Sequence, residues 1–428
     1  MVKLNYSGKR LNELDYSKVL EKSEEIAKMI DERTGLGNDF LGWLDYASTL
    51  DPKEVERINK TAERIRKNYD CLVVAGIGGS YLGARAAIEA INGLFPNDDF
   101  EIIFLGQTLS STYISQVLRH LKGKRFAINV ISKSGTTTET SVAFRMLKNL
   151  LKEQFGEEYL KDAIIATTDK ARGALKKESD EVGYEEFVIP DDVGGRYSVV
   201  TPVGLIPMAC ANINIIDFLR GFKDGEKEYS SHDLKKNPAY QYGATRYLLH
   251  KQLGYPVEVF VTYEPQFAMI AEWLKQLFAE SEGKDEKAIF PASVVFTTDL
   301  HSVGQFIQQG SPMLFETIIK TEKPIENCVV PSDEKNLDGL NYLADKELSF
   351  INDKAYEGTL DAHTVKGHCE ANIVTIEKMD AYNLGNLFYF FMRACAFSAY
   401  LLGVNPFNQP GVEVYKKNMF HLLGKEGY

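Results

Sequence analysis

Near-continuous apolar runs separated by helical patterns are the feature of this chain that most restricts its fold. Five such runs occupy residues 71–75, 101–105, 127–131, 163–167 and 186–189. After a hydrophilic stretch, four more follow at residues 257–262, 293–296, 313–319 and 371–376. Strands that are apolar on both faces are typical of parallel sheets covered by helices on both sides. The sequence therefore predicts an α/β protein with two such units.

The remaining segments divide the chain around these two units. Residues 17–32 and 52–67 have helical periodicity with Glu and Lys on the outer face, so we expect a helical packing layer there. Residues 199–219 predict one long apolar helix, and residues 333–358 predict a solvated excursion. The predicted division is an N-terminal helical segment (1–70), a first α/β domain (71–222), a second α/β domain (223–405) and a C-terminal helical segment (406–428).

Composition restricts the classes of partner. The 428 residues carry a formal net charge of -11, which argues against nucleic acid or an anionic membrane surface. The five cysteines have no paired spacing and the N-terminus has no apolar signal segment, so we expect a cytoplasmic protein with reduced thiols. Residues 384–404 are long enough to span a bilayer, but Arg393 at their centre favours a buried core helix.

The turn after the third apolar run, SKSGTTTET at 132–140, is rich in hydroxyl groups. It lies between a predicted strand and a predicted helix, where backbone N–H groups point at any ligand above the helix N-terminus. Gly135 allows close approach of the backbone, and Lys133 adds a positive charge. One alternative is a helix cap, for which a single Ser or Thr suffices. A phosphate site better explains five hydroxyls beside a lysine, namely those of Ser132, Ser134, Thr136, Thr137 and Thr138.

Two glycine-rich turns follow other predicted strands. AGIGGSYLGA at 75–84 differs from a dinucleotide-binding loop, because Tyr81 stands where the third glycine belongs. Its glycines still let the backbone approach a polar ligand closely. In DDVGGRYSVVTPVG at 191–204, a glycine pair precedes Arg196. The guanidinium of Arg196 could hold an oxyanion or pair with one of the two neighbouring aspartates.

Carboxylates and a histidine near element ends are candidates for acid-base catalysis. AESEGK at 279–284 ends an amphipathic helix with Glu280 and Glu282. His301 opens another helix after the next predicted strand. A carboxylate and an imidazole on neighbouring strand ends could share proton transfers, although each alone is more often a surface or capping residue.

Two features near the C-terminus have ordinary explanations when each is taken alone. His363, His368 and Cys369 could suggest a metal, but their spacing matches no familiar zinc pattern. FNQPGVEVYKK at 407–417 begins a short terminal helix that contains Lys416. By itself, Lys416 is interpreted as a solvated lysine.

Three stretches together resemble the glucose-6-phosphate isomerase (phosphoglucose isomerase) family, in its short bacterial form, over essentially the whole chain. They are GIGGSYLG at 76–83, DDVGGRYSVVTPVG at 191–204 and FNQPGVEVYKK at 407–417, with further matches in SKSGTTTET and AESEGK. The resemblance implies two flavodoxin-like sugar-isomerase (SIS) domains with the active site between them, and a homodimer with shared active sites. It also implies a sugar phosphate substrate and no metal or nucleotide cofactor.

The resemblance further implies a role for each matching residue. Glu280 would be the base that moves a proton between C2 and C1 of the sugar, and Arg196 would stabilise the cis-enediolate formed on the way. His301, reaching in from the neighbouring subunit, and Lys416 would assist opening of the sugar ring. The sugar phosphate would be held by Ser132, Lys133, Ser134 and Thr137, and Gly79, Ser80 and Gln409 would line the same site.

Two departures from the family pattern concern these roles. Asp299 and Leu300 stand before His301 where many members have Gly-Gln. Glu282 places a second acid beside the proposed base, and because like charges raise the pKa of a carboxyl, the sequence leaves open which glutamate does the chemistry.

The resemblance implies interconversion of glucose 6-phosphate and fructose 6-phosphate in glycolysis and gluconeogenesis. One alternative within the same class is an isomerase that also accepts mannose 6-phosphate. Another, from a different class, is a sugar-phosphate sensor. A sensor would need the phosphate site but no base, so the joint presence of Glu280, Arg196, His301 and Lys416 argues against it.

Overall fold

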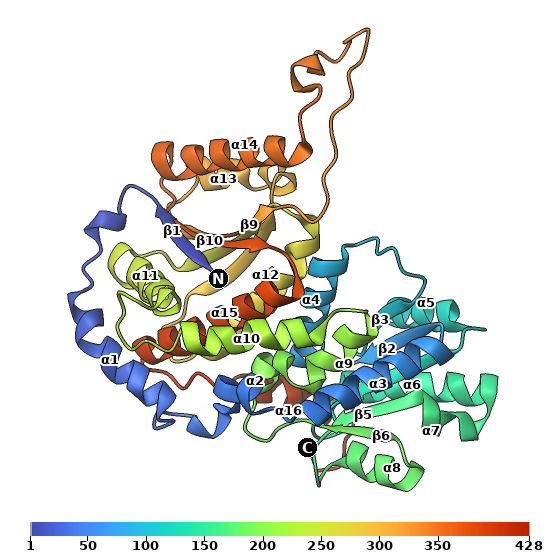
Figure 1. The fold of residues 1–428 in the computed structure, drawn as a ribbon. Coiled ribbons are helices and arrows are strands. Elements are labelled where there is room, and N and C mark those ends of the chain that lie inside the picture. The colour runs from blue at the N-terminus through green and yellow to red at the C-terminus, as the bar shows by residue number, and fades with distance from the viewer. Residues whose placement is uncertain (1, 428) are drawn as a thin grey trace.

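The computed structural model describes residues 2–427, and its two five-stranded sheets lie side by side (Figure 1). The first sheet is wholly parallel, with the strand order β3-β2-β4-β5-β6. The predicted strands of this unit are confirmed to within one residue at each end. They are β2 (Cys71–Ala75), β3 (Glu101–Leu105), β4 (Phe126–Ile131), β5 (Ile164–Thr168) and β6 (Glu185–Val188).

The strand order of the first sheet decides where a ligand can bind. β2 comes first in the chain but lies inside the sheet, between β3 and β4. In open α/β sheets, ligands bind beyond the carboxyl ends of the strands, at the point where the strand order reverses. The glycine-rich turn after β2 and the hydroxyl-rich turn after β4 both lie at this point.

A buried polar pair joins two strands of this sheet. β4 is buried along its whole length, including Asn129, the one polar residue in its apolar run. Asn129 Oδ1 accepts a 2.8 Å hydrogen bond from Oγ1 of Thr167 on β5. Because a buried polar group without a partner is costly, this bond offsets part of the cost of burying the asparagine, whose Nδ2 has no partner among the described residues.

The second sheet has the order β1-β10-β9-β7-β8. The four predicted strands of this unit are present as β7 (Val257–Thr262), β8 (Phe290–Val295), β9 (Leu314–Lys323) and β10 (Ala371–Lys378), all parallel. The N-terminal segment, for which we expected helices, also contains a strand that was not predicted, since β1 (Lys3–Ser7) pairs antiparallel with β10. β1 is a short edge strand with mostly exposed or half-buried residues, so it lacks the apolar run that identified the others.

Most of the helices cover the two sheets and fill the space between them (Figure 1). Those of the first half are α1 (Ser17–Asp31), α2 (Tyr46–Thr49), α3 (Pro52–Asn68), α4 (Leu82–Asn92), α5 (Ser111–Leu121), α6 (Thr138–Phe155), α7 (Leu160–Ala163), α8 (Ala174–Val182) and α9 (Pro202–Cys210). Those of the second half are α10 (Ile215–Glu228), α11 (Pro238–Leu253), α12 (Ala268–Glu282), α13 (Gly304–Gln309), α14 (Leu348–Leu360), α15 (Ala381–Leu402) and α16 (Val412–Leu422). The α/β prediction with helices against parallel-dominated sheets is thus confirmed.

The long apolar segment 384–404 forms most of α15, which is a core helix as predicted. It packs against α10, α11 and α12, and nearly all of its residues are buried. Arg393, in the middle of α15, is buried and lies 2.6 Å from Oδ1 of Asp31 at the end of α1. Within residues 2–427, no helix has the length and apolar character needed to cross a membrane.

The prediction of one helix over 199–219 is wrong. The segment contains the end of a 3-10 turn, then α9, and then the start of α10. Thr201 caps α9 ahead of Pro202. Asn212 adopts a left-handed conformation (φ 59°) between the two helices, and Asn214 caps α10 by accepting from two backbone N–H groups. A uniform apolar composition hid these local stop and start signals.

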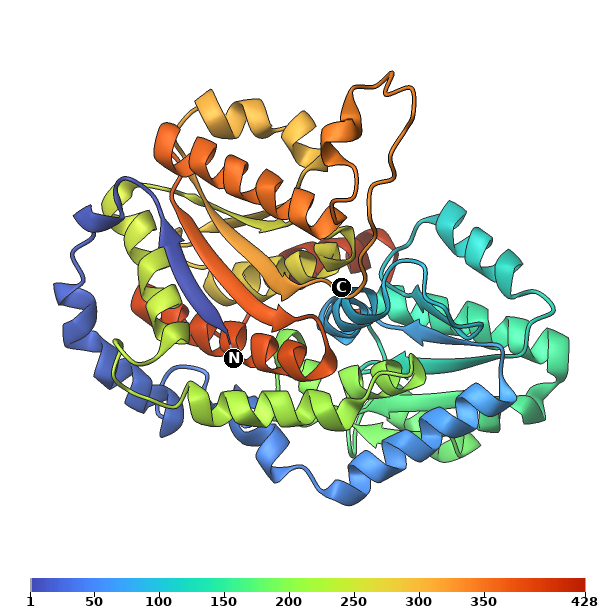
Figure 2. The same ribbon diagram turned by 45° about the horizontal axis from the view of Figure 1, so that its top comes forward.

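An extended arm, residues 324–347, leaves the end of β9 and projects from the second unit (Figure 1 and Figure 2). Most of its residues are exposed, in line with the predicted solvated excursion. The excursion begins earlier than predicted, and its last part, residues 348–360, is α14.

Candidate active site

One cleft collects ten of the predicted site residues. Its walls are the turns after β2, β4 and β5, the loop before Arg196, the C-terminal turn of α12, and the segment that leads into α16. It thus lies where the end of the first sheet meets a helix of the second unit. The predicted residues that line it are Gly79, Ser80, Ser132, Lys133, Ser134, Thr137, Arg196, Glu280, Gln409 and Lys416.

The hydroxyl-rich turn between β4 and α6 contains hydrogen bonds between its own side chains and backbone. Ser132 Oγ accepts from the backbone N–H of Gly135 at 3.0 Å, and Ser134 Oγ accepts from that of Thr136 at 3.2 Å. Gly135 has a φ of +69°, and a Cβ there would lie 2.2 Å from the backbone N of Leu175. Thr137 is the N-cap residue of α6, yet its side chain makes no capping hydrogen bond. The helix-cap alternative therefore does not account for the hydroxyl of Thr137.

The two glycine-rich turns pack directly against each other. A Cβ on Gly79 would lie 2.0 Å from the carbonyl oxygen of Gly195 and 2.7 Å from the backbone N of Arg196. Such distances are far below van der Waals contact, so any larger residue at 79 must push the turns apart. The glycine that resembled part of a nucleotide loop instead sets the position of Arg196.

Arg196 is 3% exposed and joins three parts of the site. Its Nε donates to Ser281 Oγ at 2.8 Å, and its Nη2 donates to the carbonyl oxygen of Pro406 at 2.6 Å. Its Nη1 lies 3.1 Å from Glu280 Oε2 and 3.1 Å from Gln409 Oε1. The arginine thus pairs with Glu280 and not with the neighbouring aspartates, which was the other interpretation of the sequence.

Glu280 and Glu282 occupy different environments although they are two residues apart on α12. The side chain of Glu280 is 31% exposed, lines the cleft, and accepts from Gln276 Nε2 at 3.1 Å. Glu282 is fully buried and pairs with Arg246 of α11 on the side away from the cleft. Burial raises the pKa of Glu282 above its ordinary value, and the charge of Arg246 opposes that shift. Of the two carboxylates, Glu280 is the one that a ligand in the cleft can reach.

The C-terminal segment contributes the last wall of the cleft. Gln409 reaches the cleft from the loop before α16, and Lys416 lines it from inside that helix. Lys416 Nζ lies 2.9 Å from Glu413 Oε1, one turn earlier. Its neighbour Lys417 is exposed and, unlike Lys416, does not line the cleft.

His301 is the predicted site residue that does not line this cleft. It lies in the 3-10 turn Thr298–His301 beyond β8 and is exposed. Asp299 holds this turn, since its Oδ2 accepts from the backbone N–H of Val295 at 2.8 Å. Within one chain, the imidazole is therefore not part of the Glu280 site.

Lys284 does not line the cleft, but it supports the site in a way that sequence reasoning missed. Its Nζ donates to the carbonyl oxygens of Glu280 (2.8 Å), Ser281 (2.7 Å) and Asn405 (2.7 Å). It thereby joins the end of α12 to the loop that holds Arg196. Burial, with a further contribution from the charge of Arg196, lowers the pKa of Lys284 to about 8. A lysine just past a helix end is a known signal for carbonyl capping and would have indicated this role.

Of the two histidines that could suggest a metal, His363 has a structural partner and His368 is exposed. His363 is buried and its Nδ1 lies 2.9 Å from Glu316 Oε1 on β9. Within the described part of the chain, no group of three or more His, Cys, Asp or Glu side chains is placed to hold a metal ion.

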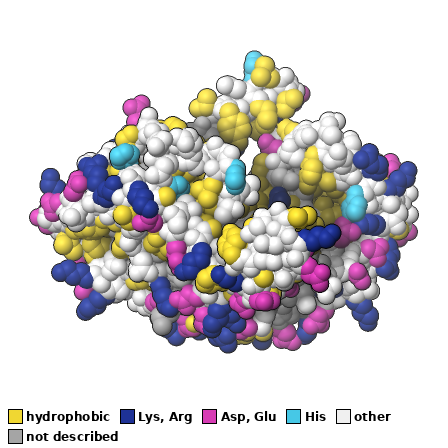
Figure 3. Space-filling view, turned by 90° about the horizontal axis from the view of Figure 1, so that it is seen from above, with side chains coloured by type: hydrophobic (Ala, Val, Ile, Leu, Met, Phe, Trp, Pro, Cys, Tyr) yellow, Lys and Arg dark blue, Asp and Glu magenta, His cyan; other side chains and the backbone are white. Residues whose placement is uncertain are grey.

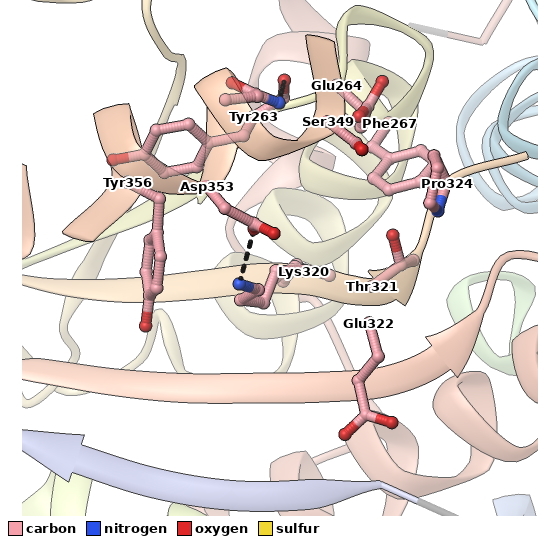
Figure 4. Close-up of a pocket in the computed structure, with 12 residues that line it drawn as sticks. Tyr263, Glu264, Phe267, Lys320, Thr321, Glu322, Pro324, Ser349, Asp353 and Tyr356 are labelled. Atoms are coloured by element: carbon pink, nitrogen blue, oxygen red, sulfur yellow. Dashed lines mark hydrogen bonds and ion pairs between the residues drawn. The ribbon is translucent and has the colours of Figure 1, made fainter. Parts of the chain in front are cut away.

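A second pocket lies at the carboxyl ends of β7 and β9, under α14 (Figure 4). Lys320 in this pocket is paired with Asp353 at 3.1 Å. Burial raises the pKa of Glu264, which also lines the pocket. None of the predicted site residues lines this second pocket, whereas ten of them line the cleft between the two units.

Comparison with known proteins identifies the family. A family model for phosphoglucose isomerase matches residues 56–426. Glucose-6-phosphate isomerases of Bacillus cereus (strain AH187) and Bacillus cytotoxicus are each 54% identical over 406 residues, which is 93% of this chain and 90% of theirs. A hypothetical protein from Thermus thermophilus has a TM-score of 0.87 at 26% identity, covering 98% of this chain and 100% of its own. A glucose-6-phosphate isomerase from Chlamydia trachomatis shares the fold, with a TM-score of 0.83 at 21% identity over 99% of this chain and 88% of its own. This chain therefore belongs to the phosphoglucose isomerase family.

Proposed function

We propose that this chain is an aldose-ketose isomerase that interconverts glucose 6-phosphate and fructose 6-phosphate in glycolysis and gluconeogenesis. The observation that carries the proposal is the pairing of a buried arginine, Arg196, with a cleft-lining carboxylate, Glu280, in the same cleft as the hydroxyl-rich turn. Family membership supports it, since the Bacillus relatives at 54% identity are named glucose-6-phosphate isomerase. A sensor would need the turn alone, whereas a base and a fixed cation are requirements of catalysis.

In this proposal the hydroxyl-rich turn fixes the phosphate end of the sugar. The donors are the side chains of Ser132, Ser134 and Thr137 and the backbone N–H groups at the start of α6, with Lys133 supplying charge. Gly79, Ser80 and Gln409 line the path between the phosphate and the reacting carbons. These contacts are made equally before and during the reaction, so they set affinity more than rate.

Glu280 then moves the proton. Its carboxylate takes the proton from C2 of the open-chain aldose, the C2–H electrons form the C1–C2 double bond, and negative charge passes to the carbonyl oxygen. The resulting cis-enediolate lies beside Arg196, whose positive charge stabilises it. Glu280 then returns the proton to C1, while the proton of the C2 hydroxyl passes to the C1 oxygen and the C2 carbonyl forms, which completes the ketose. His301 and Lys416 would open the ring by proton transfer between the ring oxygen and the C1 hydroxyl, so the route uses no metal or nucleotide cofactor.

The proposal includes a homodimer with shared active sites. His301 is exposed and outside the cleft of its own chain, so a role in ring opening requires a second copy to bring it there. The projecting arm carries exposed hydrophobic side chains such as Leu337 (86% exposed) and Tyr342 (68%), and hydrophobic groups gather on the face from which it projects (Figure 3). Such a surface is typical of one that is covered in an oligomer. We place the enzyme in the cytoplasm, where its five unpaired cysteines would stay reduced.

The direct test is conversion of fructose 6-phosphate to glucose 6-phosphate by the purified chain with a chelator and no added metal. We expect full activity under these conditions. No conversion in either direction would overturn the proposed function. Activity that the chelator abolishes would instead overturn the cofactor-free route.

A further inference from the structure

The basic side chains that line the cleft are not equivalent. Four are present, and three of them already have a carboxylate partner. Lys133 Nζ lies 2.9 Å from Asp191 Oδ1, Arg196 pairs with Glu280, and Lys416 pairs with Glu413. Within residues 2–427, no carboxylate oxygen lies within ion-pair distance of the fourth, Arg172. Among the described residues, its guanidinium is therefore the cleft cation without an ion pair, although the charge of Asp169 lies close enough to influence it.

The loop that carries Arg172 is fastened to the hydroxyl-rich turn. Asp169 is buried, and its Oδ1 accepts from the backbone N–H groups of Ala171 and Arg172, each at 2.9 Å. Thr168 Oγ1 donates to the carbonyl oxygen of Ser132 at 2.8 Å, and the N–H of Ala174 donates to that of Ser134 at 3.0 Å. The backbone of Arg172 is thus held at a fixed place beside the turn that is proposed to bind phosphate.

Gly173, the next residue, makes this close packing feasible. It has a φ of +107°, and a Cβ there would lie 2.8 Å from the carbonyl oxygen of Ser134 and 3.0 Å from that of Lys133. Only glycine adopts this conformation readily. The loop that carries Arg172 and the hydroxyl-rich turn therefore approach more closely than a side chain at 173 would allow. This close packing keeps Arg172 beside the turn that is proposed to bind phosphate.

We propose that Arg172 binds the phosphate group of the sugar substrate and sets the preference for phosphorylated sugars. This inference rests on the proposed function and adds a residue to it. A phosphate monoester carries a charge of about -1.5 to -2 at neutral pH, and the charge of Lys133 is shared with Asp191. A guanidinium with free donors matches the phosphate oxygens in geometry and charge.

The test compares three variants for steady-state isomerisation of fructose 6-phosphate. Arg172→Gln should raise KM about tenfold or more while leaving kcat within about twofold, because the contact is the same in the ground and transition states. Arg172→Lys should lie between this variant and the wild type, since it keeps the charge and loses the fork geometry. Lys170→Gln is the matched control, because Lys170 is exposed in the same loop but does not line the cleft, and its KM should not change.

Two further readouts separate the possible failures. The difference in KM between the wild type and Arg172→Gln should shrink at high salt, because the lost contact is electrostatic. Fructose 6-phosphate should also raise the Tm of the wild type more than that of Arg172→Gln at equal concentration. A wild type without isomerase activity would overturn the proposed function. An active wild type whose KM and ligand-induced Tm shift match those of Arg172→Gln would overturn the role of Arg172 alone.

Discussion

The guanidinium of Arg196 and the carboxylate of Glu280 lie 3.1 Å apart although 84 residues separate them in the chain. Arg196 is almost fully buried and bonded on all sides, whereas the side chain of Glu280 is partly open to the cleft. The position of the cation is thus fixed without substrate, and the carboxylate beside it is accessible to a ligand in the cleft. In the proposed reaction, a fixed positive charge beside a reachable base would lower the barrier to the enediolate.

Thr137→Ala should raise KM for fructose 6-phosphate several-fold with little change in kcat or Tm. The reason is that the Thr137 hydroxyl makes no helix-capping bond, so its removal costs the helix nothing and costs a ligand one donor. Steady-state kinetics and a thermal melt of the same preparation check both parts. A drop in Tm with unchanged KM would show that the hydroxyl serves the fold.

Gly79→Ala should lower kcat/KM by about 10²-fold, because a Cβ at 79 would displace the turn that positions Arg196. The reacting groups move, while the phosphate turn stays in place. Gly358→Ala on α14 is the control, since a Cβ there meets nothing within 4 Å and should leave activity unchanged. Equal activity of the two variants would contradict the role of Gly79.

Glu282→Gln should change the pH dependence of stability in a defined direction. Burial raises the pKa of Glu282 above its ordinary 4.5, so the folded protein keeps this proton to a higher pH than the unfolded chain does. The protonated group therefore contributes fully to stability below pH 4.5, the pKa in the unfolded chain. This contribution is lost as the pH rises from 4.5 through the higher pKa of the folded protein. Glutamine has no such proton, so the Tm of the variant relative to that of the wild type should increase from about pH 4.5 toward neutral. Calorimetry across this range would contradict the account if the difference stayed constant or fell.

Subunit mixing tests the placement of His301. Glu280→Gln and His301→Ala parents should each be nearly inactive, and random reassociation of equal amounts makes about half of the dimers mixed. If His301 serves the partner's cleft, one of the two sites in each mixed dimer is intact. About a quarter of the wild-type activity should then return. Verified subunit exchange without recovery would rule out the shared site.

The sequence predicted the strands well because each is a buried, apolar run of the kind that parallel sheets require. β1 was not predicted because an edge strand with exposed residues has no such run. The break between α9 and α10 was not predicted because α9 is apolar around its whole circumference, so the apolar pattern does not mark where the helix ends. Gly79, Arg196 and Glu280 were found through local motifs, but their mutual distances depend on tertiary packing. Lys284 was missed because one of its partners, the carbonyl oxygen of Asn405, lies far along the chain. Arg172 was missed because its proposed role depends on the lack of an ion-pair partner among the described residues, which a sequence does not reveal.

The measurement that tests the account most directly compares Glu280→Gln with Glu282→Gln in the conversion of fructose 6-phosphate to glucose 6-phosphate. The two changes are chemically identical and lie two residues apart on one helix. Glu280→Gln should lower kcat by about 10²- to 10⁴-fold with KM nearly unchanged, as loss of a positioned base requires. Glu282→Gln should stay within about tenfold of the wild type, because its carboxylate is buried against Arg246 away from the cleft. The reverse order of effects, or a Glu280→Gln enzyme that keeps its turnover, would contradict the assignment of Glu280 as the base.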